Sequence, residues 1–160
     1  MKRLILSIAI IVSAISMNAQ TRTLNLELLG TAGMAGINYD ARFAENHGFG
    51  YSVCLGYGIS FSGWKCLLDP SNYGVNHQIG IPVEINYMFG KGNSHLVLGA
   101  GVYTAAVIND AAGSLQFGYM TFADFAYRYQ KPEGFSFAVG VKPNIIFEEY
   151  YPYITIGKSF

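Results

Sequence analysis

An alternation of apolar and polar residues with a period of two constrains this chain more than any other feature of its sequence. The alternation starts near residue 23, runs to the C-terminus, and is interrupted at regular intervals by Gly, Pro, Asn and Asp. A period of two is typical of β-strands with two different faces, and the interruptions are typical of turns. We therefore predict an all-β fold with eight strands, at 23–32, 35–44, 49–61, 75–89, 94–106, 115–129, 135–146 and 151–160.

The connections between these predicted strands alternate in length. Tight turns are predicted at 45–48, 90–93 and 131–134, where Gly, Asn and Pro supply the required backbone angles. Longer connections fall around 62–74 and 107–114, while the first and last connections on that same side are short. An even strand number with short periplasmic turns and longer external loops is typical of outer-membrane β-barrels.

The positions of the charged residues separate the two faces of the strands. In the sixth predicted strand Phe117 and Phe125 lie on one face, whereas Asp124 and Arg128 lie on the other. Lys158 is the one strand charge that shares the apolar face. Seven charged residues share the polar, glycine-rich face: Glu27, Asp40, Arg42, Glu84, Asp124, Arg128 and Lys142.

Side-chain volume decides which face points inward. The interior of an eight-stranded barrel is just wide enough to be filled by side chains, and the aromatic and aliphatic residues of eight strands exceed that space. We therefore predict that the apolar face contacts lipid and that the seven charges form a polar network in a filled lumen. Within it we expect the pairs Asp124–Lys142 and Glu27–Arg42. A narrow proton or ion path is the alternative interpretation of these charges.

One residue fits the predicted barrel poorly. Pro82 falls inside the fourth predicted strand, on its inward face. Proline cannot donate a ladder hydrogen bond, and a closed barrel has no edge strand to receive it. We therefore expect a β-bulge at this position.

The N-terminal residues predict export. Lys2 and Arg3 precede an apolar run over 4–14 and a small, polar stretch over 16–20, which is the pattern of a signal peptide. The run is shorter than the roughly 20 residues that a transmembrane helix needs. We predict a signal peptide over 1–19, cleaved after Ala19, and an outer-membrane β-barrel over 20–160.

The second half of the chain resembles a known group of proteins. The resemblance rests on the stretches Ile81–Lys91, Leu98–Gly101, Tyr127–Gln130 and Pro152–Phe160. These stretches resemble the small, mostly uncharacterised outer-membrane β-barrel proteins of the Bacteroidetes. Membership implies the outer membrane of a Gram-negative bacterium and an eight-stranded antiparallel transmembrane β-barrel. It also implies that Phe160 is the signal recognised by the barrel-assembly machinery, although Lys158 departs from the usual aromatic.

The charged and histidine residues exclude several classes of function. Removal of 1–19 leaves eight basic and ten acidic residues with no basic run, which argues against nucleic acid as a partner. His47, His77 and His95 have no Cys or carboxylate at ligand spacing, so we expect neither a metal nor a cofactor. A structural or interaction role without catalysis is therefore predicted. A lipid-modifying enzyme is an alternative, but it needs a nucleophile beside His77, and no Ser neighbours it in its strand.

The connection over 62–74 is the candidate contact loop of a surface-binding module. Trp64, Lys65, Asp69 and Tyr73 combine aromatic and charged side chains, as contact surfaces do. The other interpretation is that the loop packs over the barrel mouth or lies among lipopolysaccharide headgroups. We expect outer-membrane lipid and lipopolysaccharide as partners, and the sequence specifies no extracellular ligand.

Two cysteines remain after export, in a compartment that permits disulfides. Cys54 lies well inside its predicted strand, whereas Cys66 lies in the following loop. Bridged Cα atoms must approach within roughly 7 Å, so two separate thiols are favoured over a disulfide.

Overall fold

The computed structural model of the protein describes residues 21–43, 47–61, 75–109, 114–144 and 149–160. The predicted signal peptide over 1–19, the contact residues of the 62–74 loop and Cys66 lie outside the described residues. In the described part of the chain no helix has the length and apolar character to cross a membrane.

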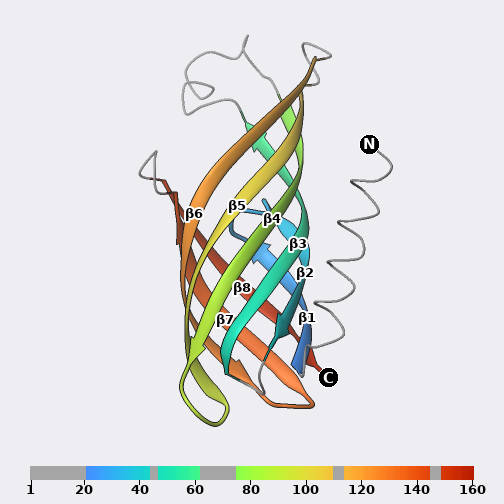
Figure 1. Ribbon diagram of the computed structural model, residues 1–160. Helices are drawn as coiled ribbons and strands as arrows, with labels where there is room; N and C mark the ends of the chain where they lie inside the picture. Colours follow the sequence, from blue (N-terminus) through green and yellow to red (C-terminus); the bar gives the residue numbers. More distant parts are fainter. Residues whose placement is uncertain (1–20, 44–46, 62–74, 110–113, 145–148) are drawn as a thin grey trace, which may run out of the picture.

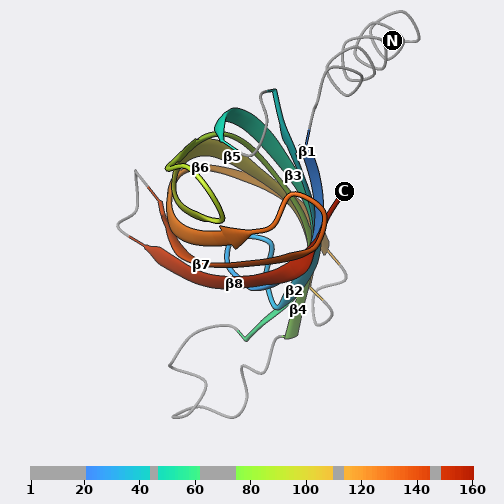
Figure 2. The ribbon, with the colours of Figure 1, turned by 90° about the horizontal axis from the view of Figure 1, so that it is seen from below.

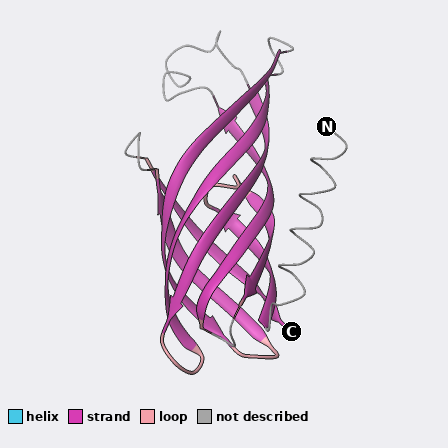
Figure 3. Ribbon diagram, in the orientation of Figure 1, coloured by secondary structure: helices cyan, strands magenta, loops and turns pink. Residues whose placement is uncertain are grey.

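Eight strands form one closed antiparallel barrel (Figures 1 and 3). Each strand pairs with the next in sequence, and β8 pairs with β1 to close the ring that Figure 2 shows from below. The predicted fold class and all eight predicted strands are confirmed. The strands are β1 (Thr21–Leu29), β2 (Ala35–Arg42), β3 (Gly48–Phe61), β4 (Val75–Phe89), β5 (Ser94–Asn109), β6 (Ser114–Gln130), β7 (Phe135–Pro143) and β8 (Tyr150–Ser159).

The strands differ in length, and the difference gives the barrel a high and a low side. Strands β3 to β6 have 14 to 17 residues, whereas β1, β2, β7 and β8 have 8 to 10. The long strands extend beyond the others at the end of the barrel opposite the C-terminus (Figure 1). At the other end, positive φ angles at Gly48, Gly90 and Gly92 allow tight turns.

The exposure of the side chains confirms the predicted faces. Ile85 is 65% exposed on the outside, while its neighbour Glu84 is 3% exposed and points inward. The same alternation separates Ile37 from Asn38 and Leu96 from Val97. The outer surface is therefore a nearly continuous apolar belt, and the interior holds the charges.

The bulge predicted at Pro82 is wrong. Val53 pairs with Val83 and Gly56 pairs with Gly80, so the register between β3 and β4 is the same on both sides of the proline. On the other side, Pro82 pairs with Tyr103 in an unbroken ladder. A proline removes one N–H group only, so the strand absorbs the missing bond without an extra residue.

The connection between β1 and β2 folds into the barrel, which the sequence did not predict. Thr31 and Ala32 are buried, and in Figure 2 this segment lies inside the ring. The N–H of Met34 donates to the carbonyl of Tyr57 at 2.9 Å, which fixes the connection against β3. Gly56 permits the approach, because a β carbon there would collide with Ala32.

Candidate functional site

The lumen nearest the tight turns contains one carboxylate shared by two guanidinium groups. Arg42 reaches both oxygens of Asp40, at 3.0 Å from Nε and 2.5 Å from Nη2. Arg128 Nη1 lies 3.0 Å from Asp40 Oδ2 and approaches it from β6, across the lumen from β2. All three side chains are buried, so the ion pairs replace water as the partner of each charge.

A second group of charges surrounds Lys142. Its ammonium nitrogen lies 3.2 Å from Glu27 Oε2 and 3.9 Å from Glu84 Oε2. Each glutamate also accepts a hydrogen bond from a buried amide, from Asn38 at 3.2 Å for Glu27 and from Asn86 at 2.8 Å for Glu84. This group joins β1, β2, β4 and β7 from the inside.

Asp124 has a phenol as its partner. The hydroxyl of Tyr153 donates to the carboxylate, 2.9 Å and 3.0 Å from its two oxygens. Lys142 lies over the Tyr153 ring, with 4.4 Å between the nitrogen and the ring centroid. Tyr153 therefore contacts the acid through its hydroxyl and the cation through its ring.

Of the two predicted ion pairs, Glu27–Arg42 is absent from the described residues, while Asp124 and Lys142 attract each other electrostatically without forming a close ion pair. Glu27 lies opposite Gly36, so Arg42 is six residues farther along β2, about 20 Å away at the rise of a strand. The Glu27–Arg42 prediction is wrong because that distance exceeds the reach of the two side chains. Asp124 and Lys142 do lie on adjacent strands, but Lys142 turns toward Glu27 and Glu84, which approach it from other walls.

The structure places all seven charged residues singled out from the sequence in the lumen, with 0 to 5% of each exposed. Sequence reasoning missed Asn38, Asn86 and Tyr153 as members of the network. Their positions on the charged face were the available signal. Tyr153 was missed because aromatic residues of such barrels generally face lipid.

Next to the Lys142 group, the lumen contains a cluster of aromatic and aliphatic side chains. Phe122 is completely buried, and it packs with Tyr103 and Ala105 in a cluster that Val107 and Met120 extend. Gly101 makes room for the Phe122 ring, because a β carbon there would lie 2.5 Å from it. These buried rings and the inward β1–β2 connection therefore occupy part of the lumen.

His77 and Cys54 are placed as follows. His77 Nδ1 lies 2.5 Å from the hydroxyl of Tyr57, and its neighbours across the strands are Ile59 and Ile108, which cannot act as nucleophiles. Cys54 is buried with a free thiol. Among the residues that the structure describes, no group of three His, Cys, Asp or Glu side chains is arranged to hold a metal ion.

Known proteins resemble this chain in structure rather than in sequence. No known protein family and no curated protein matches the sequence. The N-terminal β-barrel domain of Pseudomonas aeruginosa OprF is similar in structure, with a TM-score of 0.56, 15% identity, and coverage of 89% of this chain and 98% of that one. Ail, the attachment invasion locus protein of Yersinia pestis, solved in complex with the heparin analogue sucrose octasulfate, gives a TM-score of 0.45, 14% identity, and coverage of 88% and 95%.

These comparisons bear on the fold. The resemblance to the Bacteroidetes proteins stays a prediction. The likeness to OprF agrees with the strand pairing of the chain, which folds as a closed, eight-stranded antiparallel β-barrel of the outer-membrane type.

Proposed function

We propose that this protein is an integral outer-membrane β-barrel of a Gram-negative bacterium that has a structural or interaction role, catalyses no reaction and conducts no ions. The observation that carries the proposal is the inversion of polarity between its two surfaces. Charged residues are sealed inside, and large apolar residues cover the outside.

The outer surface supports a membrane location. Soluble monomers rarely expose contiguous apolar patches larger than a few hundred Å². Here large apolar side chains are exposed on all eight strands, from Leu24 on β1 to Ile156 on β8. Ring closure pairs every strand on both sides over part of its length, which a bilayer requires because it offers no hydrogen bonds to an open edge.

The interior of the barrel supports the proposal that the protein conducts no ions. The ion pairs of Asp40 and Lys142 cross the lumen, and the ring of the buried residue Phe122 has its centroid 5.6 Å from the Lys142 nitrogen. A path for ions would need a continuous water-filled route past these groups. Six of the seven buried charges take part in ion pairs with one another, and Asp124 accepts from the Tyr153 hydroxyl, so a structural role explains them without a pathway.

Export and assembly complete the proposal. Residues 1–19 would direct export and be removed after Ala19, and Phe160 would be read by the barrel-assembly machinery. The predicted partners are outer-membrane lipid and lipopolysaccharide. Mass spectrometry of the protein isolated from membranes should then give an N-terminus at Gln20.

The test combines cell fractionation, gel migration and planar-bilayer recording. The full-length protein should be recovered in the outer membrane and migrate faster before boiling than after it, because a closed barrel stays compact in detergent. The purified protein should give no current steps in a planar bilayer. Recovery as a soluble periplasmic protein without a heat shift would overturn the proposed location, and regular current steps would overturn the sealed lumen.

A second candidate function is that of a surface-binding module. It is favoured by a strand edge at the end of the barrel where β3 to β6 extend beyond the other strands. Strand β6 pairs with β7 from Phe125 to Gln130, with an isolated bridge at Phe122, whereas its pairing with β5 starts at Ser114. Residues 114–121 therefore pair on one side only within the described chain. Phe117 and Tyr119 of this segment are 79% and 81% exposed.

An open strand edge can accept an extended peptide as an additional strand. The loop over 62–74, with Trp64, Lys65, Asp69 and Tyr73, follows β3 at the same end and would add side-chain contacts. Peptides selected from a random display library against the purified barrel should lose binding when Phe117 and Tyr119 are both replaced by Lys. Deletion of 62–74 should weaken capture and leave the heat shift intact. Selection of no peptide, or binding indifferent to both changes, would contradict this candidate.

A further inference from the structure

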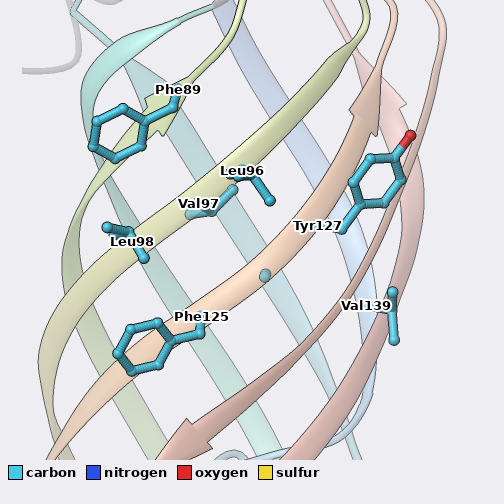
Figure 4. A pocket seen from close by; sticks show the side chains of 8 residues that line it. Phe89, Leu96, Val97, Leu98, Phe125, Tyr127 and Val139 are labelled. Atoms are coloured by element: carbon cyan, nitrogen blue, oxygen red, sulfur yellow. The ribbon is translucent and has the colours of Figure 1, made fainter.

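A hollow of about 560 Å³ lies on the outer face of the barrel, near the rim with the tight turns (Figure 4). It crosses four strands, because Phe89 of β4 pairs with Leu96 of β5, Leu96 with Tyr127 of β6, and Tyr127 with Val139 of β7. Its size falls in the range of small-molecule sites, roughly 300–1,000 Å³. The outward-facing lining residues are Phe89, Leu96, Leu98, Phe125, Tyr127 and Val139.

The hollow is apolar except at Tyr127, whose hydroxyl group leads to polar residues beyond the lining. The hydroxyl of Tyr127 lies 3.0 Å from the hydroxyl of Ser94, which is the first residue of β5. The turn before Ser94 carries Lys91, an exposed residue two positions after Phe89. An apolar trough therefore ends at two hydroxyl groups, with an ammonium group in the adjoining turn.

We propose that this hollow binds an anionic phospholipid, with an acyl chain along Leu96, Leu98 and Phe125 and the phosphate at Lys91, Ser94 and Tyr127. The inference rests on the proposed membrane location and names a lipid for that location. The rim with tight turns faces the periplasm in barrels of this type, so the ligand belongs to the phospholipid leaflet and not to the lipopolysaccharide leaflet.

Charge at this rim favours an anionic headgroup. Outside the lumen, the described charged side chains near this rim are basic at Arg22, Lys91, Lys131 and Lys158 and acidic at Glu133. Neither this hollow nor a second one, lined by Leu26, Ile37, Leu55 and Ile79 among others, has a charged residue in its lining, so the charge at the proposed site comes from the adjoining turn. The combination of a trough, hydroxyl groups and an ammonium group distinguishes the site on β4–β7.

The experiment uses native mass spectrometry of the folded full-length barrel in detergent. Equal amounts of dioleoyl phosphatidylglycerol and dioleoyl phosphatidylcholine, which share their chains and differ in net charge, are added to the protein. We expect more bound phosphatidylglycerol, and we expect Lys91→Gln to reduce that preference about fivefold, the effect of one basic residue at an anionic lipid surface. Lys91→Arg should retain the preference.

Two further variants make the test specific. Lys131→Gln removes a charge of the same rim from the neighbouring turn, and it should leave most of the preference in place. Val139→Phe fills the trough, and it should reduce the binding of both lipids. None of these side chains lies in the lumen, so each variant should keep its heat-modifiable migration.

The outcomes separate this inference from the proposed function. Equal binding of the two lipids by the unchanged protein, or a loss of preference in Lys131→Gln as large as in Lys91→Gln, would overturn the lipid site while the folded barrel stands. A protein that shows no heat shift and does not partition into membranes would overturn the location and the lipid site together.

Discussion

The ammonium nitrogen of Lys142 lies 3.2 Å from a carboxylate oxygen of Glu27, although the strands that carry them, β7 and β1, are not neighbours in the barrel. Strand β8 lies between them, so the ion pair spans the inner surface and not a ladder of backbone hydrogen bonds. Glu84 extends the contact to β4. The network therefore joins walls that the sheet itself does not join directly.

Replacement of Lys142 by Met should destabilise the barrel strongly. The change leaves Glu27 and Glu84 buried without their cation, and breaking a buried pair costs about 3–5 kcal/mol. Urea titration of the barrel in lipid vesicles measures the free energy of unfolding. Lys158→Met, on the outer face, is the matched control and should change it by less than about 0.5 kcal/mol.

A double-mutant cycle isolates the pair. Glu27→Gln combined with Lys142→Met should cost less than the sum of the single changes, by about 1–3 kcal/mol, because residues in one network are coupled. Strict additivity of the two changes would show that the pair contributes nothing of its own.

Replacement of Gly56 by Ala should displace the inward β1–β2 connection. A β carbon at Gly56 would collide with Ala32, and overpacking of this kind costs typically about 1–3 kcal/mol. The control is Gly118→Ala on β6, where a β carbon would have no atom within 4 Å. Unfolding titrations of both variants should show a loss for Gly56→Ala alone. Equal stability of the two would show that the connection does not press against β3.

An arginine on the outer face should be costly in the middle of β4 and tolerated near the rim. Val83→Arg places a charge in the centre of the apolar belt, where the cost is about 2–4 kcal/mol, whereas Phe135→Arg lies next to a turn, where it is about 0–1 kcal/mol. The difference in unfolding free energy between the two variants reports how deep each position lies in the bilayer. Similar values would mean that Val83 does not face hydrocarbon.

The sequence predicts the barrel well because strand faces depend on local alternation. Glu84 and Ile85 are adjacent, and their chemistry alone indicates that they point to opposite sides. The volume of an eight-stranded lumen then determines that Ile85 points outward. Neither step depends on which residues meet across the barrel.

Partners across the lumen could not be predicted in this way. Lys142 meets Glu27 because of barrel diameter, strand tilt and side-chain length, none of which has a local signature. The inward turn after β1 depends on the absence of a side chain at Gly56, a residue of another strand. At Pro82 a general rule about proline in sheets predicted a bulge, but a single missing hydrogen bond left the register unchanged.

We propose above all that the apolar face of the strands contacts lipid and the charged face does not. Spin-label scanning along β4 tests it directly, in a background with Cys54→Ser and Cys66→Ser. Nitroxide labels on cysteines at positions 81, 83 and 85 should be accessible to oxygen dissolved in the bilayer, while labels at 80, 82 and 86 should be shielded. Period-two alternation with this phase is the predicted result, and the opposite phase, or access of a water-soluble relaxation agent to the odd positions, would contradict the account.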